Sequence, residues 1–407
     1  MMQRITLILV SVLILLPVTV LARQPYKLGF MLEMSGRIGF AGQIAKQGAQ
    51  LAIDEINKSG GINGRQVSGV FEDSKGDPGE AAKVFTKLVE ADRVEVVIGV
   101  LSDDIAPLLA QLAKRHRIPL IITGAQTQVV TGRQCNRYTF RICPNSRQNS
   151  KIGAILAART KAKLWTAVAS DHAAGRELWT QFKAQLREMR PDASFVEGPG
   201  LEFVKSESAD WEASIQAVKK SGAQGVFVYL YGGEFIDFVK KGNGLGLFDG
   251  NREFVAVMGS LAELLGLGNS MPQGIWWSTP YWFQASRNPI NTSFVETYES
   301  RYGVPPSWQA HFSYGGVKAF SEAVRKSGTS EASAVVAALE GMTIELPVGK
   351  VVLRPQDHQA IMHAMAGQTA RMSVTQRKRS FRGLSSMILF RTKEFVEPES
   401  EIRCRFQ

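Results

Sequence analysis

Residues that can donate hydrogen bonds follow two buried, strand-like runs of the chain, 95–100 and 118–123. In a doubly wound sheet the carboxyl ends of neighbouring parallel strands meet at one edge, where helix N-termini present unpaired N–H groups. Such an edge suits an anionic or polar group of a small molecule. Ser102 is predicted to cap the helix 103–117, with the amides of its neighbours facing the same opening. The alternative is that Ser102 and Thr127 only cap helices. The residues concerned are Ser102, Asp103, Ala125, Gln126 and Thr127.

Other chemistry-bearing residues do not combine into a catalytic or metal site. The run HFSYGG, 311–316, nearly matches a nucleophile elbow, but His311 replaces the first glycine and the run lies inside a predicted helix. His358 and His363 are five positions apart, which does not place them on one helix face. His172 lies beside Asp171 at a strand end, and no nucleophile accompanies it. We therefore expect no catalysis, no metal and no cofactor.

The three cysteines have different surroundings. Cys143 alternates with apolar residues in YTFRICP and is expected to be buried as a small hydrophobic side chain. Cys135 and Cys404 lie in polar surroundings, and an oxidising compartment would favour a disulfide between them. A Cys135–Cys143 bond stays open as the alternative.

The hydrophobic pattern predicts an α/β fold with two doubly wound lobes. Strands 26–32, 94–100 and 118–123 alternate with helices 42–61 and 103–117, which implies right-handed crossovers and a parallel sheet covered on both faces. The same alternation starts again at residue 163 and continues to the strand 253–259. Two cored lobes are therefore expected.

The last third of the chain predicts three helices with few strands. These helices cannot fold alone, so we expect them to return to the first lobe, with a hinge of three chain segments between the lobes. The predicted lobes are residues 24–144 plus 277–349 and residues 145–276 plus 350–407.

The first 22 residues are typical of a secretory signal peptide. Arg4 precedes the apolar run 5–16, and Pro17 and the small residues of VLA, 20–22, follow it. The apolar run is short for a membrane span, and no later segment is apolar enough to be one. We expect export to the periplasm.

The formal net charge of +11 does not point to nucleic acid. Basic residues are spread along the chain, and the one dense cluster, 371–382, has no aromatic stacking motif beside it. It is interpreted as a solvated loop.

Longer motifs resemble a known family. The loop and helix 35–67 (SGRIGFAGQIAKQGAQLAIDEINKSGGINGRQV), the acidic turn EDSKGDPGEAAK, the strand end IPLIITGAQT and the late helices 303–328 follow one another in its order. Together they resemble periplasmic substrate-binding proteins of ABC importers, in the leucine/isoleucine/valine-binding branch of the type I fold. The resemblance runs from about Lys27 to Cys404.

The resemblance implies a ligand held between two lobes that close on a hinge. In the first lobe it implies that backbone amides and hydroxyls of the two strand-end segments hold a ligand carboxylate. In the second lobe it implies that three segments contact the ligand: the turn after Asp171, the loop around Tyr231 and Gly232, and the loop after Met258. Phe40, Tyr229, Ser260 and Tyr281 complete the expected site.

This sequence departs from the amino-acid-binding pattern at two places. Ser260 stands at or near the position of the acidic residue that pairs with a ligand ammonium, and Ala174 replaces an expected aromatic residue. An unpaired buried ammonium costs several kcal/mol. Glu234 could substitute if its helix tilts inward.

The preferred ligand is consequently an organic or aromatic carboxylate, with an amino acid as the alternative. Aromatic residues lie in or near the predicted loops, although Trp276 and Trp277 could equally pack in the core. The aromatic set is Phe40, Tyr229, Tyr231, Trp276, Trp277, Tyr281 and Trp282.

The expected function is extracytoplasmic capture of a small molecule and its delivery to the membrane subunits of an ABC permease. A ligand sensor that reports to a receptor and an exported hydrolase are the rival functions. No nucleic-acid partner is expected.

Overall fold

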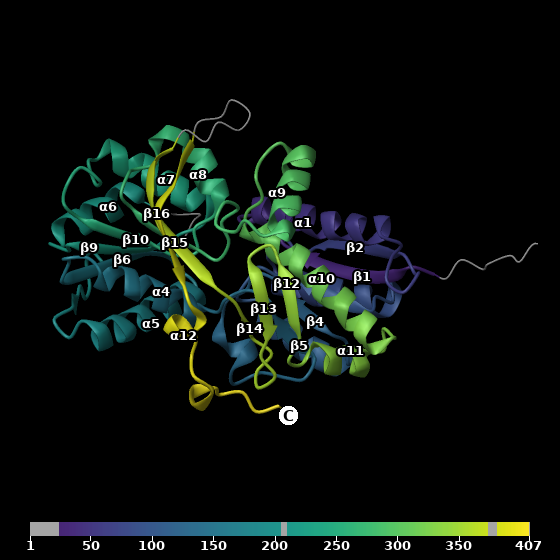
Figure 1. Cartoon of the computed structure of the whole chain (residues 1–407). Helices are drawn as coiled ribbons and strands as arrows, with labels where there is room; N and C mark the ends of the chain where they lie inside the picture. The colour runs from purple at the N-terminus through teal and green to yellow at the C-terminus, as the bar shows by residue number, and fades with distance from the viewer. Residues whose placement is uncertain (1–23, 205–209, 373–380, 407) are drawn as a thin grey trace, which may run out of the picture.

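The computed structural model describes residues 24–204, 210–372 and 381–406. It shows two α/β lobes side by side (Figure 1). The expected signal peptide and the middle of the basic cluster, 373–380, lie outside the described residues.

The first lobe is built on a five-stranded parallel sheet with the order β2-β1-β3-β4-β5. This order places β1 beside β3, with β2 outside β1, so the chain winds away from the β1–β3 pair in both directions. The carboxyl end of such a pair is the usual ligand position in doubly wound sheets. The strands are β1 (Tyr26–Leu32), β2 (Val67–Asp73), β3 (Val96–Gly99), β4 (Leu120–Ile122) and β5 (Thr139–Arg141).

Helices cover both faces of this sheet. Asp77 caps α2 by accepting the N–H of Glu80 at 2.7 Å, and Pro78 begins that helix. The first helix and a late helix pack so closely that a Cβ at Gly48 would lie 2.0 Å from the carbonyl oxygen of Ala310. The helices are α1 (Gly39–Lys58), α2 (Pro78–Thr86), α3 (Ala106–His116), α9 (Pro289–Tyr302), α10 (Trp308–Ser327) and α11 (Ala332–Leu339).

The second lobe repeats the same winding. Its parallel strands have the order β7-β6-β9-β10-β11, and β15 and β16 extend the sheet antiparallel to β11. All five residues of β9 are buried, as expected for a central parallel strand covered on both faces. The strands are β6 (Leu164–Ser170), β7 (Ser194–Phe195), β8 (Glu202–Val204), β9 (Gly225–Tyr229), β10 (Glu253–Ala256), β11 (Trp276–Thr279), β15 (Ala364–Met372) and β16 (Phe381–Phe390).

The helices of the second lobe pack against this larger sheet. Trp165, Phe182 and Phe227 are fully buried between α5 and the strands, with ring centroids of Phe182 and Phe227 4.5 Å apart. Large aromatic rings contribute much of the apolar area that such a core removes from water. The helices are α4 (Ser146–Ala158), α5 (Ala173–Met189), α6 (Trp211–Lys220), α7 (Gly232–Gly244), α8 (Leu261–Leu267) and α12 (Thr392–Phe395).

The chain passes between the two sheets three times, through residues 142–145, 280–288 and 362–363. The expected return of the late helices to the first lobe is confirmed, because α10 packs on α1 and β3. Strands β12 (Thr343–Leu346), β13 (Gly349–Leu353) and β14 (Ala360–Ile361) form a separate antiparallel sheet. The predicted boundary between residues 349 and 350 therefore falls inside the β12–β13 hairpin, and the lobe boundaries stay a prediction.

A disulfide joins the C-terminal tail to the first lobe. Cys135 and Cys404 are bonded across 269 positions of sequence, as predicted, and the Cys135–Cys143 alternative is wrong. Cys143 is the free, buried cysteine that its alternation with apolar residues predicts.

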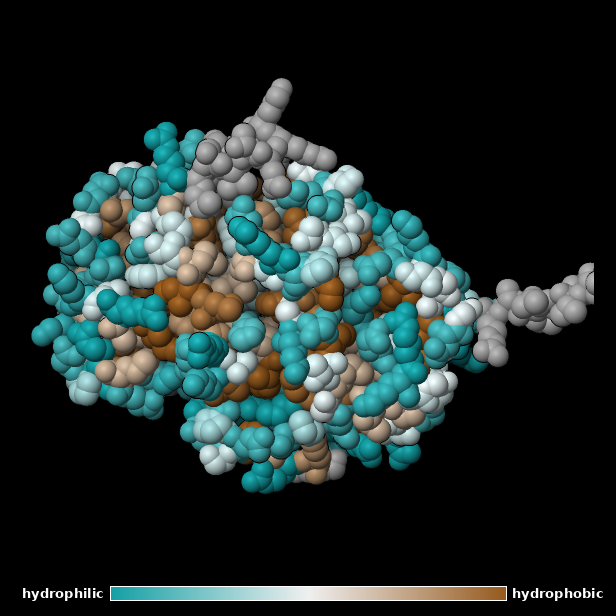
Figure 2. Space-filling view, viewed as in Figure 1, coloured by the Kyte–Doolittle hydropathy of each residue, from teal (hydrophilic) through white to brown (hydrophobic). Residues whose placement is uncertain are grey.

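Hydrophilic side chains cover much of the face in Figure 2, with hydrophobic side chains gathered across its middle. Met387 and Leu389 of β16, the outermost strand of the large sheet, are among the exposed apolar residues. Within the described ranges, no helix combines the length and the apolarity needed to cross a bilayer.

Candidate functional site

The carboxyl ends of the two central strand pairs face one cavity. The loops after β1 and β3 contribute from the first lobe, and the segments after β6 and β9 contribute from the second. Because both sheets have the same order, each lobe offers its own winding-reversal point to the space between them. The lining residues include Arg37, Phe40, Leu101, Ser102, Asp103, Asp104, Gly124, His172, Tyr229, Tyr231, Trp308 and Gln309.

A backbone turn after β3 positions the first-lobe loop. Val100 has a φ of 56°, which is rare for a β-branched residue and costs about 1–3 kcal/mol. Its N–H donates to the Met31 carbonyl at 2.8 Å, and its own carbonyl accepts the Ala125 N–H at 3.1 Å. The strained residue thus fixes the strand ends of β1, β3 and β4 to one another.

Two buried carboxylates already occupy the amides of these strand ends. Glu33 accepts the N–H of Leu101 at 2.9 Å and the N–H of Ser102 at 3.2 Å. Asp103 accepts the N–H groups of Gln126 and Thr127, the latter at 2.6 Å. The amides expected to hold a ligand carboxylate therefore bind carboxylates of the chain itself. The sequence pattern gave no sign of this, because Glu33 lies at the end of a different strand.

The capping roles are also different from those expected. Helix α3 begins at Ala106, and its cap position is Ile105, without a side-chain cap. The prediction that Ser102 caps this helix is wrong, because a turn at residues 103–105 separates them. Thr127 does cap the short helix η2 (Gln128–Thr131), whose Val129 N–H lies 3.4 Å from the threonine hydroxyl.

Burial shifts the titration of the acidic and imidazole groups. Loss of hydration raises the pKa of Asp103 to about 7; the amides of Thr127 and Gln126 oppose this shift, and the charge of Glu177 adds to it. Burial also raises the pKa of Glu33 and, together with the charge of Arg37, lowers the pKa of His172. At neutral pH His172 is consequently uncharged, and Arg37 is the cation among the residues that line the cavity.

Direct contacts between the lobes narrow the cavity to about 40 Å³, room for a few water molecules. The Gln126 amide donates to the Tyr231 hydroxyl, and its oxygen accepts from Asn149 at 2.9 Å. Arg37 forms an ion pair with Glu234 of α7 at 3.4 Å, and Ser170 donates to the same carboxylate. The contacts of Gln126 with Tyr231 and Asn149, and of Arg37 with Glu234, join the two lobes across the cavity.

Aromatic rings form the walls of the cavity. The rings of Tyr229 and Tyr231 meet edge to face with centroids 5.1 Å apart, and His172 lies 6.0 Å from Tyr229. Phe40 lies against Gly232, where a Cβ would meet the ring at 2.2 Å. Gly232 also has a φ of 49°, so a side chain there would be strained as well as obstructed.

Several expected site residues lie outside the cavity. Asp171 pairs with Arg176, and Tyr281 is buried against His311 with its hydroxyl donating to Asn291 at 2.7 Å. Ser260 is fully buried, caps α8 and donates to Gln309 at 3.2 Å, so it supports a lining residue.

For Trp277 the alternative of packing in the core is confirmed. Trp277 is buried in the core, packed against Gly259 and Phe235, and neither Trp276 nor Trp282 lines the cavity. Trp308 and Gln309, at the start of α10, do line it. In the sequence these two residues follow a pair of prolines, which indicates the start of a helix and does not indicate a binding role.

The histidines excluded from catalysis have structural surroundings. His311 is inside α10, where burial lowers its pKa to about 3, and its ring stacks on Tyr281 with centroids 4.5 Å apart. His358 is fully buried against Phe140. Across the described part of the chain, no group of three His, Cys, Asp or Glu residues could hold a metal ion.

Two doubly wound lobes with one cavity between their strand ends define a two-lobed solute-binding fold. The chain belongs to the family described as periplasmic binding protein, whose profile matches residues 25–373.

Relatives of known name agree with this assignment. A leucine-, isoleucine-, valine-, threonine- and alanine-binding protein of Pseudomonas aeruginosa is 23% identical over 81% of this chain and 86% of its own length. Leu/Ile/Val-binding protein homolog 4 of Brucella melitensis is 21% identical over 93% of this chain and 92% of its own length.

Solved structures share the fold. A solute-binding protein of an ABC transporter from Rhodopseudomonas palustris, in complex with 3,4-dihydroxybenzoic acid, has a TM-score of 0.81 at 22% identity, covering 90% of this chain and 98% of that one. Another from R. palustris, in complex with 4-hydroxybenzoate, has a TM-score of 0.79 at 21% identity, covering 91% and 98%. An amino acid ABC transporter substrate-binding protein of Pseudomonas fluorescens has a TM-score of 0.81 at 19% identity, covering 95% and 100%.

Proposed function

We propose that this protein captures a small aromatic or other organic carboxylate between its lobes outside the cytoplasm and delivers it to an ABC permease. The observation that supports this most directly is the composition of the cavity. A guanidinium, Arg37, faces a space walled by Phe40, Tyr229, Tyr231, His172 and Trp308.

The charges favour an anion without an ammonium group. Arg37 is about 40% exposed at its side chain, and one of its nitrogens donates to Glu234 at 3.4 Å. The guanidinium has five N–H donors, so others remain for a second carboxylate. At the position where an ammonium-binding acid would be expected, Ser260 is committed to capping α8. When the lobes are further apart than in this structure, a ligand carboxylate at Arg37 would place the ring of an aromatic acid among the aromatic walls.

Closure follows from the same contacts. Residues of the first lobe, such as Arg37 and Ser102, can bind the ligand while the lobes are apart. Tyr229, Tyr231 and His172 reach it only when the lobes approach. A ligand that contacts both lobes therefore stabilises the closed form by its differential affinity. The membrane partner would recognise this closed form, and no bond of the ligand needs to break.

The ligand class can be tested by thermal unfolding with a panel of benzoate, 4-hydroxybenzoate, 3,4-dihydroxybenzoate, leucine and alanine. A true ligand at 100 times its dissociation constant stabilises the protein by about 2.7 kcal/mol. We expect aromatic acids to raise the unfolding temperature and aliphatic amino acids to leave it unchanged. Stabilisation by leucine with none by any aromatic acid would overturn the ligand class and leave the binding function intact.

An amino acid is the second candidate, and one observation favours it. Asp104 lines the cavity and could face an ammonium group. The panel, extended by a decarboxylated and an N-acylated analogue of leucine, decides, because the zwitterion should then stabilise the protein and these two analogues should not.

Transport and sensing differ in the partner. Uptake of radiolabelled ligand by proteoliposomes that contain the permease, measured with and without this protein, tests delivery. Export can be checked by fractionating cells, where the mature chain should appear in the periplasmic fraction and lack residues 1–22. Ligand binding without any stimulated uptake would favour the sensor function.

A further inference from the structure

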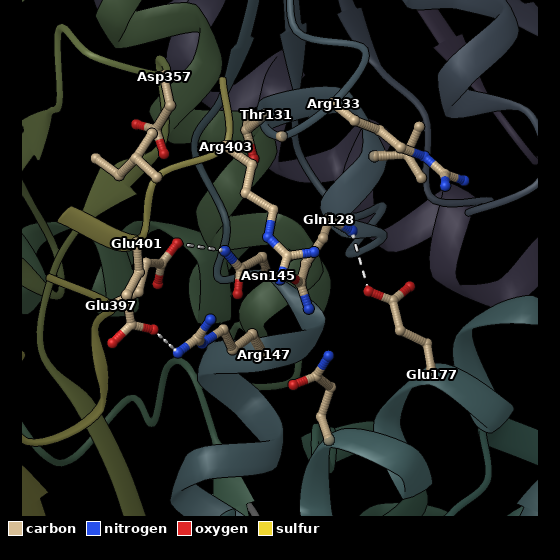
Figure 3. A pocket seen from close by; sticks show the side chains of 14 residues that line it. Gln128, Thr131, Arg133, Asn145, Arg147, Glu177, Asp357, Glu397, Glu401 and Arg403 are labelled. Atoms are coloured by element: carbon tan, nitrogen blue, oxygen red, sulfur yellow. Dashed lines mark hydrogen bonds and ion pairs between the residues drawn. The ribbon is translucent and has the colours of Figure 1, made fainter. Parts of the chain in front are cut away.

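A second and larger cavity, of about 380 Å³, lies beside the hinge (Figure 3). It is within the range of about 300–1,000 Å³ that is usual for small-molecule sites. Its walls come from the loop around η2 in the first lobe, from the starts of α4 and α5 in the second lobe, and from the C-terminal tail, residues 396–404. We call it the hinge cavity. None of the aromatic residues of the candidate ligand site lines it.

Arginines of the protein hold three of the four acids that line the hinge cavity. Arg354, which lies behind the wall, pairs with Asp357 at 2.6 Å and with Glu397 at 3.1 Å. Arg147 of α4 pairs with Glu401 of the tail. Two arginines thus hold three lining acids, Asp357, Glu397 and Glu401, so one negative charge among them is not balanced by an ion pair.

Glu177 is the remaining acid, and hydrogen bonds satisfy it. It accepts from the Ser146 hydroxyl at 2.7 Å and from the Gln128 N–H at 3.4 Å. The Thr127 hydroxyl approaches its other oxygen at 3.5 Å.

Hydrogen-bond donors without partners remain. Among the described residues, neither Arg403 nor Arg133 has an ion pair or a side-chain hydrogen bond, and the buried Nε2 of Gln128 has no acceptor. Figure 3 shows Arg403 extending from the tail toward Gln128 and Asn145, and the guanidinium of Arg133 pointing away from them. The lining acceptor without a partner is Glu397 Oε2, on a carboxylate that Arg354 already holds. The unmatched groups are thus mainly cationic or neutral donors.

We propose that the hinge cavity is a second binding site, for a small oxyanion such as a carboxylate or phosphate ion. Arg403 supplies the guanidinium fork that matches two oxygens of such an anion, Gln128 supplies its side-chain N–H, and Arg133 adds a positive charge to the wall. An anion there contacts the first lobe, the second lobe and the tail together, so its binding is coupled to hinge movement.

The tail provides matched control variants. Arg405, two residues beyond Arg403, directs its guanidinium to the Ile402 and Cys404 carbonyls and does not line the cavity. Arg137, four residues beyond Arg133, pairs with Glu340. Arg403→Met and Arg133→Met can thus be compared with Arg405→Met and Arg137→Met, which remove the same charge outside the cavity.

The test is titration calorimetry of the full mature protein with sodium phosphate and with sodium acetate, against sodium chloride at equal ionic strength. We expect saturable binding of at least one oxyanion, weakened about tenfold or more by Arg403→Met and unchanged by Arg405→Met. Arg37→Gln should leave this binding intact, which separates the site from the one under Proposed function. The proposal would be overturned if phosphate and acetate gave no saturable heat beyond that of chloride. It would also be overturned if Arg403→Met and Arg405→Met weakened anion binding equally.

A direct measurement covers the case in which a variant misfolds. Crystals of the unaltered protein soaked in selenate should show an anomalous peak within hydrogen-bonding distance of Arg403. Peaks confined to other surface arginines would contradict the site.

Discussion

Arg37 is the side chain on which the ligand assignment chiefly depends. Arg37→Gln keeps a polar group of similar reach and removes the charge that a carboxylate would meet. A hydrogen bond to a charged group contributes about 1.5–3 kcal/mol, so we expect affinity for the aromatic acid to fall roughly 10- to 150-fold. Calorimetric titration measures this change. Arg176→Gln, which removes an exposed arginine paired with Asp171 outside the cavity, should change affinity little.

Asp103 makes stability depend on pH. Its folded-state pKa of about 7 lies above the ordinary value of 3.8, so between these values the folded protein binds the proton more strongly than the unfolded chain. The contribution of this proton to the free energy of unfolding is fully present below pH 3.8 and is lost as the pH rises from 3.8 toward about 7. Buried Glu263, with a pKa of about 7, acts in the same direction.

Asp103→Asn should therefore make the decline of stability with pH less steep, because the asparagine side chain can accept hydrogen bonds from the N–H groups of Gln126 and Thr127 and does not titrate. Urea unfolding of both proteins at several pH values from 4.5 to 7.5 measures the difference. Parallel curves for the two proteins would show that Asp103 does not titrate in this window.

At the scale of elements, small residues set how closely helices approach. At Gly48 a Cβ would collide with the Ala310 carbonyl, so Gly48→Ala should push α1 away from α10. Overpacking of this kind costs about 1–3 kcal/mol, more than the helix-propensity gain of alanine. Gly244→Ala at the end of α7, where a Cβ meets nothing within 4 Å, is the control and should be neutral or stabilising. Equal unfolding midpoints for the two variants would contradict the packing argument.

The elements themselves could be predicted because their signals are local. The strand 26–32 and the late helix containing HFSYGG follow from apolar periodicity, and both occur as expected. The partners of the strand-end amides could not be predicted, because Glu33 is 68 positions before Leu101 and only the β1–β3 pairing brings them together. Trp308 and Gln309 enter the cavity for the same reason, since α10 returns to the first lobe from far along the chain. Tyr281 was expected beside the ligand because it lies in or beside a predicted site loop, yet its ring packs on His311 and its hydroxyl donates to Asn291 within the core.

At the scale of the molecule, the C-terminal tail is a fourth connection between the lobes. It leaves the second-lobe sheet at Phe390 and passes α12, which packs on α4. It then contacts Arg147 and Arg354 on its way to the disulfide with Cys135. Cys135 lies only eight residues after Thr127, whose N–H donates to Asp103, so the disulfide is close in sequence to a loop of the candidate site. The tail therefore connects the second lobe, through the disulfide at Cys135, to the segment that follows the η2 loop.

This connection predicts a large stability effect of removing the disulfide. In the unfolded protein the disulfide closes a loop of 269 positions, which limits the conformations of the chain. The double variant Cys135→Ser/Cys404→Ser removes this constraint, and such a loss typically lowers the free energy of unfolding by about 2–5 kcal/mol. Urea unfolding with and without reductant is the measurement: reductant should lower the midpoint of the unaltered protein toward that of the double variant and leave the variant unchanged. The remaining thiol, Cys143, is fully buried and its pKa is raised to about 12 by burial, so it should not form replacement disulfides in the folded state. If the double variant unfolds at the same urea concentration as the oxidised protein, the disulfide does not contribute measurably to stability. The ion pairs of the tail and the burial of Phe395 would then be enough to hold the tail in place.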